Sequence, residues 1–498
     1  MIDYSTVTML PLLNLFFIFK ILIYSLIILI FIFFSKKIKF LKSMPVFNIF
    51  FNLAQFFSLF FILYSYLLLL ETIHSYIFNI TTDFLFLPYT FNYFFFEKDF
   101  FIFCSYFQFD LFSLIILFVA FSVGFLCLVV LTPRVSADNE YLSIIFLVFL
   151  LVVFVLCFTT NVFVWLIMYE CLLLPSFYVV YTASAARRSV QASLYFIIFT
   201  QIGSFIVVCV TLYIVHVSGS VYFFDISKIK FTASERFFLY FFLFIGFGIK
   251  IPIWPFHYWL TKTHVEASAG FSMYLSGFLV KIAALGFYKF SLLINGNINT
   301  SLFLAICIVG IVDASLKLFS QTDLKKIVAY CTILEMNLIF LGIIWGNTSI
   351  MLGSLYFIYT HAFLSSLMFF LVDCLQKRYN TRNVTSLCGV MHTTPNLAIA
   401  IFLMIVIFSG IPGTMKFVSE ITIFSSLNQF SPFFCFFLIL IMNFFSMVGF
   451  CKSWFNILFG MSPKFADSNI VDLTIYEILV IFFCIFFLVF GTFFLFLN

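Results

Sequence analysis

The chain has 498 residues, of which 64% are hydrophobic and 9% are charged, and its formal net charge is +5. Soluble domains carry about 25% charged residues, so a chain with so few charges could not cover a surface exposed to water. The composition excludes an ordinary soluble enzyme and gives no support to nucleic-acid binding. It predicts an all-α polytopic membrane protein, in which about 20 apolar residues make one span.

The predicted elements are fourteen transmembrane helices, joined by short polar segments that leave no room for a soluble domain. The longest connection, 71–103, is acidic and aromatic. In chain order, the apolar runs predict spans near 10–34, 46–70, 104–131, 141–158, 161–183, 192–217, 237–257, 268–292, 300–320, 326–345, 348–372, 396–424, 432–458 and 473–497.

Lysine and arginine are distributed unevenly between the two sides of these helices. The connections after odd-numbered helices, with the helix ends beside them, hold 15 of these residues, whereas the other set holds 5. Because basic residues remain on the cytoplasmic or matrix side of a membrane, we expect the odd-numbered connections to lie there. Both termini then face the opposite compartment.

The composition also favours a particular membrane. The 83 phenylalanines are typical of an AT-rich genome, and the N-terminal stretch lacks the Arg-rich amphipathic pattern of a transit peptide. We therefore expect a protein made inside an organelle. It would lie in the mitochondrial inner membrane with its termini facing the intermembrane space. A bacterial plasma membrane is the alternative.

Two of the predicted spans are interrupted. Pro252 and Pro255 lie at the end of the seventh, and Gly410, Pro412 and Gly413 interrupt the twelfth. Interrupted helices at corresponding positions of two halves are typical of inverted-repeat transporters with a central path. The pattern predicts two inverted five-helix repeats, formed by helices 4–8 and 9–13, with helices 7 and 12 broken.

Ionisable side chains lie inside the predicted spans, where a charge at the bilayer centre costs on the order of 3 kcal/mol. Burial disfavours the charged forms of lysine and glutamate alike, so a proton can pass between such groups through water at modest cost. A Lys–Glu pair such as Lys250 with Glu170 could act as a switch. The candidate relay residues are Glu170, Lys250, Lys281, Glu335, His361 and Glu420.

The alternative interpretation of each buried charge is a structural ion pair or a side chain whose charged end reaches the membrane surface. We favour that interpretation for Asp313 and Lys317, which are four residues apart on one helix face. No two cysteines form a C-x-x-C pair, and no Gly-rich phosphate loop is present. We therefore expect no bound cofactor and no metal site in this chain.

Several linked motifs make the sequence resemble a known family. The stretch 248–270, GIKIPIWPFHYWLTKTHVEASAG, is similar to the signature of the antiporter-like subunits of respiratory complex I. Its HVEA segment resembles the chain-four branch. Further matches are YECLLLP at 169–175, QTDLKKIVAY at 321–330, THAFLSS at 360–366 and GIPG at 410–413.

The resemblance covers about residues 105–460 and suggests three parts. These are an N-terminal pair of helices with its loop (1–103), an antiporter-like proton-translocating core (104–460), and a C-terminal loop with the last helix (461–498). The resemblance implies a subunit of the proton-translocating NADH:ubiquinone oxidoreductase that has no redox centre of its own. Its partners would be neighbouring membrane-arm subunits and the lipid bilayer, with no nucleic acid and no soluble substrate.

The resemblance also implies roles for individual residues. In the family, the carboxylate matching Glu170 pairs with the lysine matching Lys250. The residues matching Lys281 and His361 form the central hydrophilic axis, and the glutamate matching Glu420 ends the path towards a neighbouring subunit. The supporting candidates are His257, His264, Glu266 and Lys416.

The sequence departs from the family pattern in two places. Most relatives carry histidine where Glu335 stands, so the resemblance does not settle its role in a relay. Lys416 lies four residues before Glu420, where relatives usually carry a small or neutral residue. Since residues four apart share a helix face, we expect Lys416 and Glu420 to pair.

Two other functions are compatible with buried charges in a membrane protein. A stand-alone Mrp-type cation/proton antiporter subunit would depend on sodium and have a bacterial operon context. A structural membrane-arm subunit would use its buried charges only to hold helices together. In that case Lys250→Ala would weaken assembly without uncoupling whatever assembles.

Overall fold

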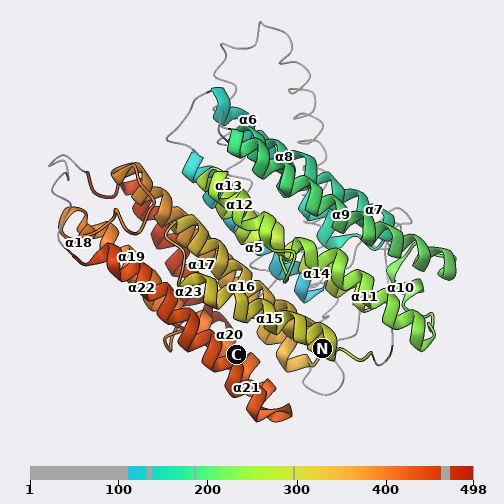
Figure 1. The fold of residues 1–498 in the computed structure, drawn as a ribbon. Helices are drawn as coiled ribbons and strands as arrows, with labels where there is room; N and C mark the ends of the chain where they lie inside the picture. The colour runs from blue at the N-terminus through green and yellow to red at the C-terminus, as the bar shows by residue number, and fades with distance from the viewer. Residues whose placement is uncertain are drawn as a thin grey trace, which may run out of the picture.

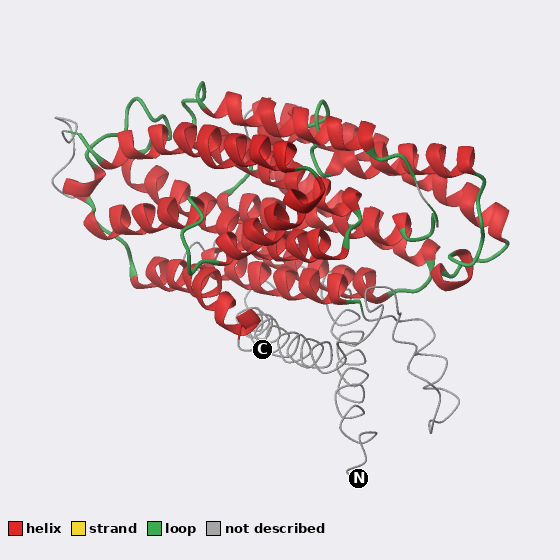
Figure 2. Ribbon diagram, turned by 90° about the horizontal axis from the view of Figure 1, so that it is seen from below, coloured by secondary structure: helices red, strands yellow, loops and turns green. Residues whose placement is uncertain are grey.

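Long apolar helices make up the part of the chain that the computed structural model describes, which comprises residues 110–131, 137–183, 187–294, 296, 298–460 and 471–496. The predicted spans 10–34 and 46–70 and the connection 71–103 lie outside these residues. Two isolated antiparallel bridges are the only extended pairings within the described residues, and Figure 2 shows helices joined by loops throughout that part.

The first half of the described chain contains the helices that surround the first predicted break. Seven of these helices have ten or more residues, and shorter helical segments lie between them. In chain order the elements are α5 (Leu111–Leu131), α6 (Ala137–Phe158), α7 (Val162–Cys171), α8 (Leu173–Thr182), α9 (Arg187–Ser218), α10 (Phe223–Ile226), α11 (Ala233–Lys250), α12 (Tyr258–Glu266), α13 (Ala269–Tyr274), the π-helical turn η3 (Leu275–Leu279) and α14 (Val280–Ser291).

The second half surrounds the second predicted break and ends with the last helix. Its elements are α15 (Ser301–Leu318), α16 (Leu324–Trp345), α17 (Thr348–Tyr379), α18 (Val390–Thr393), α19 (Pro395–Phe408), α20 (Met415–Phe430), α21 (Pro432–Ile439), the π-helical turn η4 (Leu440–Phe445), α22 (Ser446–Leu458) and α23 (Ile475–Phe496).

Local sequence signals explain several of these boundaries. The side chain of Asn161 accepts hydrogen bonds from the first amides of α7, and Asp323 does the same for α16. Thr232 and Glu235 form a capping box at the start of α11. Such groups satisfy amides that have no partner within the helix. Gly346 ends α16 in the left-handed conformation, with φ = 72°, which glycine adopts without steric cost.

The described helices agree with the predicted spans from 104–131 onwards. Within the described residues, eight helices are long and apolar enough to cross a membrane, and three shorter apolar helices accompany them. The seventh predicted span is broken after Lys250, and the twelfth is broken between Phe408 and Met415, as predicted. The protein is therefore an all-helical polytopic membrane protein.

The predicted span near 161–183 is present with one short interruption. The segment Val162–Thr182 is long and apolar enough to cross a membrane, and a turn at Leu172 divides it into α7 and α8. Pro175 lies three residues further on. Proline has no amide hydrogen, so it cannot donate to the carbonyl four residues earlier, which belongs to Cys171. This break places Glu170 next to the end of a helix rather than in the middle of one.

Loop contacts show which connections share a side of the molecule. Leu324 donates its amide to the carbonyl of Arg382, and Lys325 and Arg382 donate to the carbonyls of Ala267 and Val265. The connections after the seventh, ninth and eleventh predicted spans therefore meet. A bridge between Asn161 and Tyr222 joins the connections after the fourth and sixth.

The two halves of the chain lie side by side and meet at α17. Figure 1 shows α6–α9 along one flank and α19–α22 along the other, with α12–α14 and α17 between them. Helix α17 contacts α5, α13 and η3 of the first half as well as α16 and α20 of the second. Residues of η3 and α17 therefore line the junction between the halves.

Close backbone contact holds part of the first half together. A Cβ atom on Gly203 of α9 would lie 2.7 Å from the carbonyl oxygen of Gly246 in α11. Only glycine permits this approach. Small residues at such crossings are how helices gain packing contacts in lipid, where the hydrophobic effect between helices is absent. The crossing fixes α11, and with it Lys250, against α9.

Candidate functional site

Lys250 is the last residue of α11 and stands at the first helix break. Its side chain is buried, and its Nζ lies 3.7 Å from the centroid of the Tyr169 ring of α7. A cation over an aromatic face gains electrostatic stabilisation in a desolvated site. The negative end of the α11 dipole favours a cation at this position as well.

Glu170 lies beside Tyr169 but does not contact the Lys250 ammonium. Within the described residues its Oε1 is buried without a hydrogen-bond partner, and it acts on Lys250 only through longer-range electrostatic attraction. The sequence predicts that Glu170 and Lys250 form a switch pair. In the structure the two residues lie near each other, and the ring of Tyr169 contacts the lysine. Tyr169 was not among the predicted site residues.

A small cavity adjoins Lys250. Its volume is about 10 Å³, which is about the smallest space that holds one water molecule. Ser176 and Thr200 line it together with Lys250, so polar groups are available to bind such a water. Trp259 also lines the cavity and donates its indole N–H to the carbonyl of Ile249, 2.8 Å away, which fixes the broken end of α11.

Lys281 is fully buried at the junction of the two halves. Its Nζ donates to the carbonyl of Ser276, five residues earlier, across the π-helical turn η3. Such turns are often found at functional positions of helices. Glu335 of α16, in the second half of the molecule, attracts the Lys281 ammonium electrostatically.

Glu335 lies at the centre of a contiguous cluster in the second half. Its Oε1 accepts a hydrogen bond of 2.9 Å from Lys416 of α20, and its Oε2 lies 3.9 Å from Nε2 of His361 in α17. The Nζ of Lys416 is also 3.8 Å from Oε1 of Glu420. All four side chains are no more than 6% exposed.

Lys416 therefore has more partners than its sequence position suggested. The expected contact with Glu420 is present, but the shorter contact is with Glu335, 81 positions away. Lys416 also donates to the carbonyl of Phe408, 2.7 Å away, and lies 3.8 Å from the centroid of the Phe408 ring. That carbonyl belongs to the last residue of α19, so the lysine bridges the second helix break.

Two buried histidines complete the central region. His361 and His264 have no hydrogen-bond partner for either ring nitrogen within the described residues. The His264 ring stacks on Phe369 of α17 at 4.5 Å. His264, Lys281 and Lys416 all act electrostatically on His361. An imidazole in this setting can accept a proton on one nitrogen and donate from the other.

His257 and Glu266 lie apart from the central cluster. His257 Nε2 is 3.2 Å from Lys317 Nζ and 3.4 Å from Asp313 Oδ2, and Lys317 and Asp313 form an ion pair of 2.6 Å. The pairing assigned to Asp313 and Lys317 is therefore present, and His257 extends it to the loop of the first break. Glu266, at the end of α12, is partly exposed.

Two basic residues that sequence reasoning did not select hold the end of α12. Lys325 donates to the carbonyl of Ala267, and Arg382 donates to that of Val265, each at 2.8 Å. Arg382 also pairs with Asp323 at 3.1 Å. Lys325 falls within the 321–330 motif, which is the signal that could have found it. These contacts fix the segment that carries His264.

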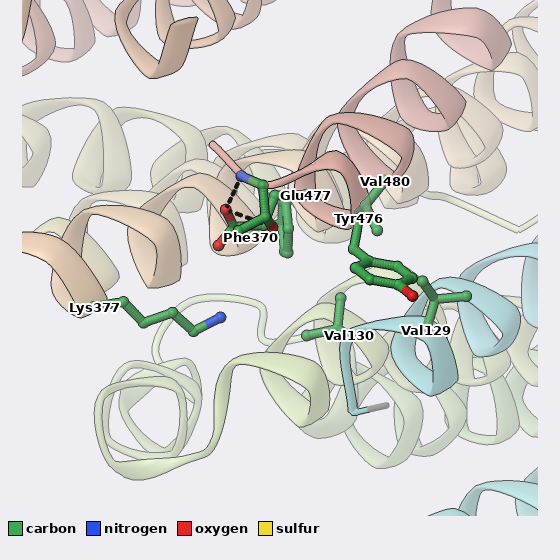
Figure 3. Close-up of a pocket in the computed structure, with 8 residues that line it drawn as sticks. Val129, Val130, Phe370, Lys377, Tyr476, Glu477 and Val480 are labelled. Atoms are coloured by element: carbon green, nitrogen blue, oxygen red, sulfur yellow. Dashed lines mark hydrogen bonds between the residues drawn. The ribbon is translucent and has the colours of Figure 1, made fainter. Parts of the chain in front are cut away.

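The described residues offer no metal site, and a second, larger cavity is lined by none of the candidate relay residues. No group of three or more His, Cys, Asp or Glu side chains in the described part could hold a metal ion. A cavity of about 290 Å³ lies between α5, α17 and α23, and Figure 3 shows Lys377 and Glu477 at its edge. Lys377 pairs with Asp373 and Glu477 pairs with Arg378, at 2.5 and 2.6 Å.

Comparison with known proteins adds independent findings. Residues 159–446 match the family described as "NADH:quinone oxidoreductase/Mrp antiporter, TM". NADH-ubiquinone oxidoreductase chain 4 of Paramecium tetraurelia is 42% identical over 388 residues, which are 78% of this chain and 82% of that one.

Two solved structures share the fold. A chain of respiratory complex I from Thermus thermophilus with bound NADH superposes with a TM-score of 0.70 at 21% identity, covering 78% of this chain and 83% of that one. A chain of the Mrp complex from Dietzia sp. superposes with a TM-score of 0.65 at 20% identity, covering 73% and 69%. Identities this low bear on the fold alone.

Proposed function

The chain belongs to the NADH:quinone oxidoreductase/Mrp antiporter family, as a chain-4 type subunit of NADH:ubiquinone oxidoreductase, and we infer that it pumps protons across a coupling membrane within that complex. NADH oxidation and quinone reduction take place in other chains. This chain supplies the membrane path and binds no redox cofactor of its own.

The observation that carries this function is the contiguous cluster in the second half. His361, Glu335, Lys416 and Glu420 follow one another at 3.9, 2.9 and 3.8 Å, all buried among apolar helices. Each ionisable group inside a bilayer carries a free-energy cost. A series of acids and bases within about 4 Å of one another is suited to passing protons along by short rearrangements.

We assign stations to the relay residues in the order in which the fold arranges them. Glu170 and Lys250 form the first station, beside the small cavity that fits a water molecule. Lys281 carries the proton across the junction at η3 to His361 and Glu335. Glu420 forms the last station. His257, His264, Glu266 and Lys416 support these groups by fixing the broken segments or by balancing charge.

The proposed function includes an architecture and a location. The complete chain has fourteen transmembrane helices in two inverted five-helix repeats, each with one broken helix. It lies in the mitochondrial inner membrane, with both termini in the intermembrane space and the basic connections in the matrix. Its partners are neighbouring membrane-arm subunits, and the 42% identity to a mitochondrial-type chain 4 supports this location over a bacterial membrane.

The test is the ratio of membrane potential to NADH oxidation in reconstituted complexes that carry Lys250→Ala. We expect assembled complexes to lose both pumping and NADH oxidation, because an obligatory relay is coupled to the redox reaction. Lys228→Met is the matched control, since Lys228 forms an exposed ion pair with Asp225 outside the relay. Unchanged pumping by assembled Lys250→Ala complexes would contradict the relay.

A stand-alone cation/proton antiporter is the second candidate, because the Mrp fold and family match this chain as well. The two functions differ in a measurable way. Complex I membership requires copurification with flavin and iron–sulfur subunits. An Mrp-type subunit requires sodium-dependent transport without NADH, so sodium transport by this chain would favour that function.

A further inference from the structure

We propose that Lys416 is a shared cation that alternates between Glu335 and Glu420, so that a proton bound at one carboxylate is exchanged for a proton released at the other. The proposal rests on the proposed function and deepens it. It gives Lys416 a positioning role, in which the ammonium moves between partners and keeps its own protons.

The geometry of Lys416 suits this role. One ammonium group lies 2.9 Å from Glu335 and 3.8 Å from Glu420, so a small shift of the side chain exchanges the shorter contact for the longer one. The carbonyl and the ring of Phe408 hold the ammonium beside both carboxylates, at 2.7 Å and 3.8 Å from its Nζ. This anchor keeps the cation within reach of both carboxylates and prevents its escape along the second helix break.

Charge balance limits how many protons the three groups hold. One buried cation beside two buried carboxylates neutralises only one of them, and an unpaired charge in this setting is strongly disfavoured. The favoured composition is thus one ammonium, one carboxylate and one protonated carboxyl. Two arrangements satisfy it: the proton is on Glu420 while Lys416 pairs with Glu335, or the proton is on Glu335 while Lys416 pairs with Glu420.

The exchange between these arrangements balances. An N–H bond of protonated His361 breaks and an O–H bond forms at Oε2 of Glu335, which leaves His361 neutral. Lys416 then moves to Glu420, whose O–H bond breaks as its proton passes to water or to an acceptor beyond. One proton enters, one leaves, and the charge of the three-residue group is unchanged.

The charged and polar groups that act on this cluster come from four surrounding elements, α14, α16, α17 and η4. Lys281 of α14 acts on Glu335, and Cys331 of α16 acts on Lys416. His361 faces Glu335 from α17, and Asn443 of η4 reaches Glu420. Asn443 is exposed on the outer face of the described helices. Glu420 is therefore the member of the cluster closest to that face, where a proton can leave.

The two departures from the family pattern fit the same interpretation. Glu335 and Lys416 stand at the two positions where the resemblance leads us to expect a histidine and a small or neutral residue, and the structure places their side chains in direct contact. The added acid and the added base compensate each other. A histidine at 335 could accept a proton without a cation beside it, whereas a glutamate at 335 requires one.

The test compares two double variants in the complete reconstituted complex. Glu335→Gln with Lys416→Met removes the ion pair and leaves no group at 335 that can take a proton. Glu335→His with Lys416→Ala restores the pattern of the relatives. We expect both to assemble, but only the second to pump, with the first losing about tenfold or more of its proton transfer. The exposed pair, changed by Lys228→Met with Asp225→Asn, is the control.

Several outcomes would overturn the proposal. Normal pumping by the Glu335→Gln, Lys416→Met variant would make the pair purely structural. If the Glu335→His, Lys416→Ala variant fails to assemble or to pump, Glu335 and Lys416 do not compensate each other as proposed. A third variant, Lys416→Arg, keeps a permanent charge, and loss of pumping in an assembled complex would show that Lys416 itself must give up a proton.

Failure of this proposal is distinguishable from failure of the proposed function. Variants at 335 and 416 test only the last part of the path, whereas Lys250→Ala tests the relay as a whole. If Lys250→Ala abolishes pumping and Glu335→Gln with Lys416→Met does not, the chain pumps protons without the alternating cation. If neither change affects pumping, the result contradicts the proposed function itself.

Discussion

The environments of Lys250 and Lys416 differ although both lysines adjoin a helix break. Lys250 ends α11 and faces the ring of Tyr169, with the carboxylate of Glu170 out of contact. Lys416 follows the second break and touches the carboxylate of Glu335 directly. A helix break thus provides a place for a buried cation, and the neighbouring helices decide whether an aromatic ring or a carboxylate stabilises it.

This difference has energetic consequences. A cation–π contact contributes about 0.5–2 kcal/mol. Removal of one partner of a buried ion pair costs about 3–5 kcal/mol, because the other charge is left uncompensated. The cluster around Lys416 should therefore respond more strongly to the loss of one side chain than the site around Lys250 does to the loss of its ring.

The largest effect should come from Lys416→Met. This change leaves Glu335 and Glu420 without a cation, so we expect a destabilisation of about 3–5 kcal/mol and a marked loss of assembled complex. Glu335→Gln should cost less, since Lys416 keeps Glu420 as its partner. For both variants, thermal denaturation measures the loss of stability, and the yield of assembled complex measures the loss of assembly. Equal losses for the two variants would mean that Glu420 does not stabilise Lys416.

An intermediate effect should come from Gly410→Ala. Gly410 has φ = +70°, and a Cβ atom there would lie 3.0 Å from Oε2 of Glu420. We expect backbone strain of about 1–3 kcal/mol, together with displacement of the carboxylate and slower pumping. Gly219→Ala is the matched control, because Gly219 has φ = +66° with no atom within 4 Å of an added Cβ. If Gly410→Ala and Gly219→Ala complexes pump equally well, the close approach of Gly410 to Glu420 has no effect on pumping.

The smallest effect should come from Tyr169→Leu. Loss of the ring removes the cation–π contact with Lys250 and should destabilise the complex by about 0.5–2 kcal/mol. Tyr169→Phe keeps the ring, and the hydroxyl has no hydrogen-bond partner within the described residues, so this variant should behave as the unaltered protein does. Thermal denaturation measures the difference in stability between Tyr169→Leu and Tyr169→Phe. A loss in Tyr169→Phe as large as in Tyr169→Leu would assign the role to the hydroxyl.

The sequence predicted those parts of the fold that depend on local chemistry. Apolar runs predicted the described spans, and proline and glycine predicted the breaks near Lys250 and Gly410. Spacing within a helix also predicted the contact of Lys416 with Glu420. The break at Leu172 was missed although Pro175 signalled it, because a proline near a helix start is often tolerated.

Contacts between distant segments could not be predicted in the same way. The pairing of Lys416 with Glu335 joins α20 to α16, and hydropathy does not encode which faces of two helices meet. The position of the Tyr169 ring against Lys250 likewise depends on how α7 packs on α11. The sequence therefore predicted the helices and their breaks more reliably than the contacts between distant side chains.

The π-helical turn η3 makes the length of its span as important as its composition. A π-helical turn accommodates one more residue than the α-helix around it. Deletion of a single residue within 277–279 would restore regular α-helical winding and shorten the spacing between Ser276 and Lys281 from five residues to four. The wide turn that lets the Lys281 ammonium donate to the carbonyl of Ser276 would then be lost. In evolution, this segment should accept substitutions far more readily than deletions.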